Sequence, residues 1–303
     1  MLPLAATLAL VGVGSAVLID RFGGWPSGGG ASEPLYLAGE DSGGDGQAYT
    51  ANGRTGAGPV TVASAVAAFD GLNAVRPGIA CYGVAVLDRN TGQVTVGADG
   101  ATTFYSASVV KVYTVVDILH RAEAEQRVLT ADQYDFVQRA LSRSDDNAMN
   151  ALWDEFGGSR TITEMIGLAN LRDTRAPADP KEWGETLVSA RDVVGVYQYA
   201  LTQLSQIDQI TVLGALASAP DVGADGFDQA FGLLHGPRAP GVAAKQGWMV
   251  DGPLMYLHSA GVTGRYVVAL LSRQPAQVGY QAGKAELSAA ATNLVNTLQG
   301  LTG

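Results

Sequence analysis

The pattern of apolar and polar positions divides the chain into three parts. Residues 2–19 are apolar and uncharged, which is borderline between a signal peptide and a membrane-spanning anchor. Residues 23–59 are rich in Gly, Ser, Asp and Glu and hold few large apolar side chains, so they cannot bury enough surface to fold. The pattern therefore predicts an export or anchor segment over 1–22, a disordered linker over 23–59 and a folded domain over 60–303.

The flanks of the apolar segment narrow its role. No basic residue precedes it, so its orientation in a membrane cannot be predicted from charge. No cysteine follows it in the linker, so lipid attachment at a cysteine is not expected. We expect an extracytoplasmic protein that is either anchored through this segment or secreted after its cleavage, with no other contact to the membrane.

The sequence patterns at both ends of the folded domain predict strands of a single sheet and helices that flank it. Helical spacing over 60–72 is followed by a strand over 79–87, and an Asn90-Thr-Gly turn leads into a strand over 93–96. Alternation and turn residues near the C-terminus predict three more strands and a last helix, over 242–250, 254–262, 265–272 and 282–298.

The stretch between these ends, from about residue 104 to about residue 235, is mostly helical in its apolar spacing. The predicted fold class is therefore α/β (α+β). An antiparallel five-stranded sheet is flanked by the N- and C-terminal helices, and an all-helical lobe is inserted between its strands. A ligand is expected in the cleft between the sheet and this lobe.

Composition and charge restrict the partners. The chain has 303 residues, a formal net charge of -10 and a pI near 4.7, which argues against nucleic acid because phosphate binding needs a clustered basic surface. The single cysteine, Cys81, excludes an intrachain disulfide framework, and the three histidines show no metal-ligand spacing. We expect a monomer that acts on a small molecule without a metal or an organic cofactor.

Ser108 and Lys111 stand three residues apart in an otherwise apolar run. On a helix these positions share a face, so the lysine can reach back to the hydroxyl. Burial lowers the pKa of a lysine, and the neutral amine can then take the serine proton. The β-branched residues of the run also fit a buried strand, but its length favours a helix.

Two further polar groups stand in ordered contexts. Ser144, Asp145 and Asp146 precede an amphipathic helix, and a helix cap is the simplest interpretation of them alone. Lys245 and Gly247 fall on the same side of a predicted strand, where the glycine would let a ligand approach the backbone. A lysine on an exposed edge of the sheet is the alternative interpretation.

Together, Ser108-Val-Val-Lys111, Ser144-Asp-Asp146 and Lys245-Gln-Gly247 occur in the order of the motifs of penicillin-recognising serine hydrolases. Over roughly residues 60 to 300 the sequence resembles class A β-lactamases and their relatives.

The resemblance implies a role for each catalytic residue. Ser108 would be the acylated nucleophile and Lys111 its base, and Ser144 would relay the proton to the leaving nitrogen. Lys245 would hold the substrate carboxylate and support that relay. The backbone amides of Ser108 and Trp248 would form the oxyanion hole.

Two motif positions depart from the family pattern. Asp146 stands where the family has an asparagine that binds the substrate, and its carboxylate would repel some substrates while pairing with a nearby lysine. Gln246 replaces a threonine or serine, which removes a hydroxyl donor for the substrate carboxylate. Asp146 and Gln246, together with Gly247 and Trp248, are the predicted substrate-binding residues.

The region of the Ω-loop, residues 171–186, lacks a clear counterpart of the glutamate that activates the deacylating water. Glu182 and Glu185 are candidates, but a solvated loop charge is the simpler interpretation of either.

The sequence therefore predicts an exported β-lactamase-like serine hydrolase with slow turnover, acting by acyl transfer through Ser108 on β-lactams or on cell-wall peptide amides. A D,D-peptidase-like or esterase-like hydrolase is one alternative, and a non-catalytic cell-envelope binding protein that retains the fold is another. The altered second and third motifs favour the binding protein, whereas the intact pair of Ser108 and Lys111 counts against it.

Overall fold

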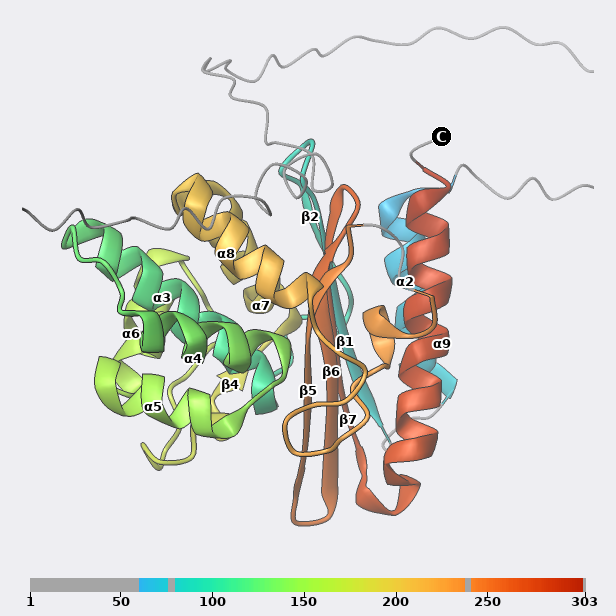
Figure 1. The fold of residues 1–303 in the computed structure, drawn as a ribbon. Coiled ribbons are helices and arrows are strands. Elements are labelled where there is room, and N and C mark those ends of the chain that lie inside the picture. The colour runs from blue at the N-terminus through green and yellow to red at the C-terminus, as the bar shows by residue number, and fades with distance from the viewer. Residues whose placement is uncertain (1–59, 76–79, 238–240, 302–303) are drawn as a thin grey trace, which may run out of the picture.

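The computed structural model describes residues 60–75, 80–237 and 241–301, shown in colour in Figure 1. The predicted segment 1–22 and linker 23–59 lie outside these residues. In the described ranges, no helix is both long and apolar enough to cross a membrane, and no group of three or more His, Cys, Asp or Glu side chains is placed to hold a metal ion.

The five predicted strands form one antiparallel sheet, which confirms the sheet of the predicted fold class. Its spatial order is β2-β1-β7-β6-β5, so the first and last parts of the chain meet where β1 pairs with β7. The observed strands begin and end within three residues of the predicted ones: β1 Cys81–Asp88, β2 Val94–Val96, β5 Ala243–Asp251, β6 Leu254–Thr263 and β7 Tyr266–Pro275. β5 is an edge strand, and it is this edge that borders the site described below.

Two helices, α2 (Val62–Val75) and α9 (Gly279–Gln299), cover one face of the sheet (Figure 1). We call this the two-helix layer. Its core joins apolar side chains of the helices to those that the strands turn toward them, among them Phe69, Leu257 and Leu287. α9 lies close to the sheet at Gly283, where an added Cβ would come within 2.8 Å of Leu257 and Met255 side-chain atoms.

The helical lobe covers the other face and contains α3 Val110–Ala124, α4 Ala131–Ser142, α5 Asp146–Phe156, α6 Ser159–Leu168, α7 Ala190–Gln203 and α8 Gln206–Ala217. α3 is its central helix, since its residues from Val110 to Leu119 are all buried. A second apolar core joins α3, α5 and α7 to the sheet through side chains such as Tyr256 and Val262 of β6. The strands thus feed two cores, one on each face, because successive side chains alternate.

Side-chain caps fix where the helices of the lobe begin. Thr130 accepts from the Gln133 amide while the Gln133 side chain accepts from the Thr130 amide, which is a reciprocal capping box at α4. Ser189 and Ser205 cap α7 and α8, since their hydroxyls accept hydrogen bonds from the backbone amides of Asp192 and Asp208, three residues on. These caps satisfy amides that a helix start leaves free.

The loop between α6 and α7 is tied to the lobe by one buried carboxylate. Asp192 accepts hydrogen bonds from the backbone amides of Arg172, Asp173 and Thr174 at 2.7–3.1 Å. The loop continues through the short helix η2 (Trp183–Glu185) to β4 (Leu187–Val188), which pairs with β3 (Phe104–Tyr105). The loop is thereby held next to the segment that leads to Ser108.

Ser108 lies in a 3-10 turn, η1 (Ala107–Val109), which runs directly into α3. The sequence led us to expect Ser108 and Lys111 on one regular α-helix. In the structure only Lys111 lies in α3, and Ser108 lies in the 3-10 turn before it, through which the chain passes from β3 into the helix. His258 of β6 holds β3 in place: its Nε2 donates to the Tyr105 carbonyl at 2.7 Å, and its Nδ1 accepts from the Ser272 amide. Burial lowers the pKa of His258 to about 4, so this histidine stays neutral in its structural role.

Candidate active site

Ser108 sits at a strained bend of the backbone. Its neighbour Ala107 has a φ of +45°, a left-handed conformation that is costly for a residue with a side chain. The bend is held by Ser106, whose amide donates to the Thr186 carbonyl at 2.8 Å and whose hydroxyl lies 3.2 Å from the Gly184 carbonyl. The loop before α7 thus helps to fix the direction of the Ser108 side chain.

Lys111 lies under Ser108 and is fully buried. Its Nζ donates to Ser108 Oγ at 2.6 Å, to Asp146 Oδ1 at 2.7 Å and to the Ser144 carbonyl at 3.2 Å. Burial lowers the pKa of Lys111, and the Asp146 carboxylate partly opposes this by favouring the charged form. The nucleophile and amine that the sequence predicts as a pair are within hydrogen-bond distance of each other.

The second motif serves both as a helix cap, through Asp145, and as part of the candidate active site, through Ser144. Asp145 caps α5 by accepting from the Asn147 and Ala148 amides, as the helix-cap interpretation predicts. Ser144 has a φ of +56° and turns its hydroxyl inward, where Oγ accepts from Lys245 Nζ at 2.8 Å. The motif is therefore both a helix cap and a connection between the two lysines.

Lys245 and Gly247 face the helical lobe, as the alternation along β5 predicts. Lys245 is buried, and its Nζ donates to Ser144 Oγ and, at 2.9 Å, to the Gln246 carbonyl. A Cβ added at Gly247 would stand 3.0 Å from the Ser106 carbonyl oxygen, so the glycine lets β5 run close against η1. The burial of Lys245 excludes the alternative of a solvated lysine on an exposed edge.

Gln246 does not face the site, which corrects its assignment as a substrate-binding side chain. It lies on the opposite side of β5, is 1% exposed and donates through Nε2 to the Phe231 carbonyl. Its Oε1 is buried without a hydrogen-bond partner. Side chains of neighbouring strand residues point to opposite faces, so Gln246 cannot accompany Lys245 and Gly247.

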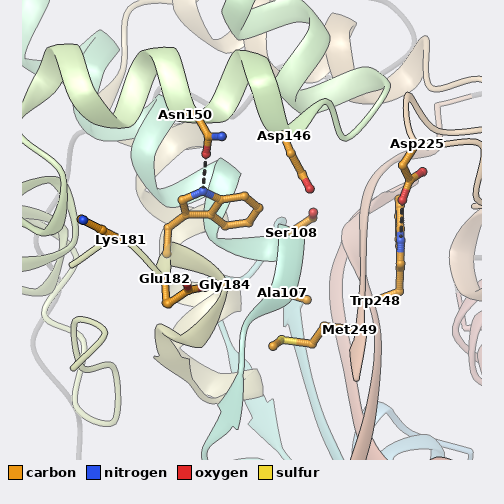
Figure 2. A pocket seen from close by; sticks show the side chains of 11 residues that line it. Ala107, Ser108, Asp146, Asn150, Lys181, Glu182, Gly184, Asp225, Trp248 and Met249 are labelled. Carbon is orange, nitrogen blue, oxygen red and sulfur yellow. Dashed lines mark hydrogen bonds between the residues drawn. The ribbon is translucent and has the colours of Figure 1, made fainter. Parts of the chain in front are cut away.

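A pocket of about 380 Å³ opens beside Ser108. Figure 2 shows Ser108 and Asp146 meeting in its middle, with Trp248 and Asp225 along one wall. Trp248 Nε1 donates to Asp225 Oδ2 at 3.0 Å, and the Trp248 ring stacks on Phe227 with centroids 4.6 Å apart. Of the predicted substrate-binding residues, Asp146 and Trp248 thus line the pocket, whereas Gly247 is not among its lining residues.

The loop between α6 and α7, in which the sequence shows no clear counterpart of the deacylating glutamate, places the indole of Trp183 beside Lys111. The Trp183 ring centroid lies 4.3 Å from Lys111 Nζ, and Trp183 Nε1 donates to Asn150 Oδ1 at 2.8 Å. Glu182 lines the outer part of the pocket and is exposed, and Glu185 is half-buried. Neither carboxylate is a hydrogen-bond partner of Lys111, whose partners are Ser108, Asp146 and Ser144.

Trp183, Asn150 and Asp225 are among the pocket residues that sequence reasoning missed. Trp183 and Asp225 come from loops far from the three motifs, whereas Asn150 stands four residues after Asp146 on α5. Trp183 lies in the region already singled out for its missing base, so a large apolar residue there was the one available signal for it. Helical spacing from Asp146 was an available signal for Asn150, since positions four apart share a helix face, whereas Asp225 carries no distinguishing pattern in the sequence.

Burial and the neighbouring Lys111 both disfavour the charged form of Lys245. Burial holds the pKa of Lys245 well below its usual value, and the nearby Lys111 charge lowers it further. Among the described residues, Asp146 is the carboxylate that pairs directly with Lys111, and its side chain is 62% exposed while that of Lys111 is fully buried. A neutral amine next to Ser108 is the protonation state that general-base chemistry requires.

Comparison of sequences gives one kind of relative. No protein-family model matches the chain. The chain is similar to "Putative lipoprotein LppW" of Mycobacterium tuberculosis and Mycobacterium bovis, with 37% identity over 206 residues. The match covers 65% of this chain and 64% of the relative, so the chain spans somewhat less than two thirds of the mycobacterial protein.

Comparison of structures gives a consistent fold. A class A β-lactamase from Bacteroides cellulosilyticus has a TM-score of 0.65 and 15% identity, over 79% of this chain and 99% of that one. PBP-A has a TM-score of 0.60 and 14% identity, over 77% and 95%. A PBP-A variant, described as an acyl-enzyme complex with penicillin G, has a TM-score of 0.57 and 15% identity, over 78% and 94%. The chain therefore has the fold of the class A β-lactamases and of PBP-A.

Proposed function

We propose that the protein is a serine hydrolase that forms an acyl-enzyme at Ser108. The observation that carries the proposal is the 2.6 Å contact between Ser108 Oγ and the buried Lys111 Nζ, at the wall of a pocket that can admit a small substrate. A hydroxyl beside an amine whose pKa is lowered by burial is an activated nucleophile. The fold it shares with PBP-A, for which an acyl-enzyme with penicillin G is described, supports the same chemistry.

The contacts suggest a route for two protons, with Lys111 entering as the neutral amine and Lys245 as the ammonium. Ser108 Oγ attacks the carbonyl carbon of the substrate while its proton passes to neutral Lys111 Nζ. When the bond to the leaving nitrogen or oxygen breaks, the Ser144 hydroxyl gives its proton to that atom and is reprotonated from Lys245, 2.8 Å away. Acylation leaves Lys111 with one more proton and Lys245 with one fewer, so a proton must return from Lys111 to Lys245 before the next turnover. The backbone amides of Ser108 and Trp248 remain the predicted donors to the oxyanion, because β5 runs against η1 at Gly247.

Hydrolysis of the acyl-enzyme should be slow. A deacylating water needs a carboxylate or an amine positioned to activate it, and the indole of Trp183 occupies the space over Lys111. Asp146 is the carboxylate nearest to the nucleophile, but its Oδ1 is engaged by the Lys111 ammonium. We therefore expect efficient acylation relative to deacylation, as in penicillin-binding proteins.

β-Lactams and cell-wall peptide amides are the acyl donors that the resemblance suggests. An esterase-like activity is the second candidate, and a specific observation favours it: Gln246 faces away from the pocket while Asp225 lies along its wall. Neither feature suits a substrate carboxylate. A non-catalytic binding protein is the remaining alternative, and it offers no reason for a buried lysine at Ser108.

We further propose that the folded domain works outside the cytoplasm. The mycobacterial relative carries the name of a lipoprotein, and the apolar segment 2–19 predicts export or anchoring. The apolar segment 2–19 is the proposed anchor or export segment. Digestion of the folded domain by protease added to intact cells is the expected result, and protection of residues 60–303 would contradict an external location.

Mass spectrometry of the intact protein tests the enzymatic proposal. The full chain is incubated with a panel of β-lactams and with the neutral ester p-nitrophenyl acetate. We expect a mass increase equal to one acyl group, mapped by peptide analysis to Ser108 and absent in Ser108→Ala. No adduct with any compound would favour the non-catalytic binding protein.

A further inference from the structure

The walls of the pocket carry more negative than positive side chains. Among the described residues that line it, Asp146, Glu182 and Asp225 bear carboxylates and Lys181 alone bears an ammonium group. Asp225 and Glu182 are exposed and lie on different walls, as Figure 2 shows. A substrate that enters this pocket therefore meets carboxylates on more than one side.

The buried lysines do not offer their charges to a ligand. Lys245 is 1% exposed, and its Nζ is engaged by the Ser144 hydroxyl and the Gln246 carbonyl. Lys111 is fully buried and paired directly with Asp146. Burial also lowers the pKa of both lysines, which reduces their mean charge.

Asp225 is held beside an aromatic ring. Its Oδ1 accepts from the Phe227 amide at 2.9 Å and its Oδ2 accepts from Trp248 Nε1 at 3.0 Å, so the carboxylate is fixed at the rim. The Trp248 ring, stacked on Phe227, lines the pocket next to it. A carboxylate together with an aromatic ring is the combination that attracts alkylammonium groups.

A second indole lies across the pocket, where the Trp183 ring contacts the amine of Lys111. Its centroid is 4.3 Å from Lys111 Nζ. The side chain that could have donated to a substrate carboxylate, Gln246, points to the other face of the sheet and donates to Phe231. The carboxylates and indole rings of the lining thus favour a cationic ligand. The Gln246 side chain, which could have bound an anionic ligand, is turned away from the pocket.

We infer that the site selects acyl donors whose non-reacting part carries a positively charged amine or quaternary ammonium group, and discriminates against donors that carry a carboxylate. The inference rests on the proposed acyl transfer at Ser108 and specifies its substrate class. Asp225 and Trp248 are the specificity-determining residues of this preference, since they form the wall that meets the charged group.

Three p-nitrophenyl esters test the preference because they differ only in the group on the fourth carbon of the acyl chain. The butyrate ester is neutral, the 4-(trimethylammonio)butyrate ester is cationic and the glutarate monoester is anionic. Second-order rate constants for acylation of the full chain are divided by the rates of hydroxide hydrolysis of each ester. We expect the order cationic, neutral, anionic.

Asp225→Asn keeps an acceptor for Trp248 Nε1 and removes the charge. The ratio of cationic to anionic rates should fall by roughly fivefold, as expected for one exposed charge contact. Asp154→Asn, at an exposed position of α5 that does not line the pocket, is the matched control and should leave the ratio unchanged. The wild-type ratio should also fall as salt is raised, a measurement that needs no variant.

The outcomes separate this inference from the proposed function. Adducts on Ser108 that form equally fast with all three esters, or fastest with the anionic one, would overturn the charge preference and leave the acyl transfer standing. A ratio that Asp225→Asn and salt both leave unchanged would also overturn it. If none of the esters gives an adduct on Ser108, the acyl transfer itself is contradicted and this inference falls with it.

Discussion

At the scale of single residues, Asp146 sets the state of the nucleophile. It is the carboxylate that contacts Lys111, and it keeps part of that lysine charged while burial acts in the other direction. The amine can accept the Ser108 proton only when it is neutral. Asp146 therefore opposes the base that it holds in position, and the balance between burial and pairing decides the pH at which Ser108 reacts.

Asp146→Asn should shift the pH profile of acylation to lower pH. Removing the carboxylate leaves burial less opposed, so the pKa of Lys111 falls and the neutral amine is present at lower pH. The measurement is the rate of Ser108 acylation by p-nitrophenyl acetate as a function of pH, with Asp154→Asn as control. A midpoint that moves to higher pH, or does not move, would show that Lys111 is not the titrating base.

The Trp183 indole leads to a second prediction at this scale. A chromogenic cephalosporin should give a burst near one equivalent of enzyme and then slow turnover, because loss of one general base costs a factor of about 100 to 10,000 in rate. Glu182→Gln and Glu185→Gln should leave the slow phase unchanged, and Ser108→Ala should remove the burst. Rapid steady-state hydrolysis that either glutamine variant abolishes would place the deacylating base in the loop after all.

At the scale of elements, the site depends on how closely the edge strand β5 approaches the turn η1. The sequence pattern predicts β5, β6 and β7 to within three residues because alternation and turn residues are local signals. The same alternation places the Gln246 side chain on the face of β5 opposite to that of Lys245. The family motif instead predicted Gln246 as a substrate-binding residue, and that prediction was wrong. Trp183 and Asp225 could not be predicted, since loops without periodicity bring them to the pocket.

Gly247→Ala tests this close approach. The new Cβ would stand 3.0 Å from the Ser106 carbonyl and 3.2–3.3 Å from Val109 and Ala107 side-chain atoms, so β5 and η1 must move apart. Displacing the nucleophile from the predicted oxyanion amides should slow acylation by up to about 100-fold. Gly167→Ala in α6, where the added Cβ meets no atom within 4 Å, is the control and should acylate normally. Equal rates for the two variants would mean that this approach does not position Ser108.

At the scale of the whole molecule, the sheet couples the helical lobe to the two-helix layer. β6 gives Met255 and Leu257 to one core and Tyr256 and Val262 to the other, so neither core can lose its packing without disturbing the shared strand. The site lies on the lobe side, between an edge strand and helices that the sheet supports. Its geometry should therefore persist only while both cores are intact.

Leu287→Ala in α9 tests that coupling from the side of the molecule away from the pocket. Leu287 is fully buried in the core of the two-helix layer, and its truncation should lower the free energy of unfolding by about 2 to 5 kcal/mol. Trp153 and Trp183 belong to the helical lobe and the loop that packs on it, whereas Trp248 packs against the core of the two-helix layer and Trp25 lies outside the described residues. In a background with Trp25→Phe and Trp248→Phe, tryptophan fluorescence therefore reports on the opposite face. If the sheet couples the layers, fluorescence and far-UV circular dichroism should show one coincident transition at a lower temperature. Ile207→Ala, at a helix position that is 72% exposed, makes a similar truncation at the surface and should change the free energy of unfolding by no more than about 0.5 kcal/mol.

Two separate transitions in Leu287→Ala, with tryptophan fluorescence unchanged in the first, would contradict the coupling. They would show that the helical lobe and its site stay folded after the two-helix layer has unfolded.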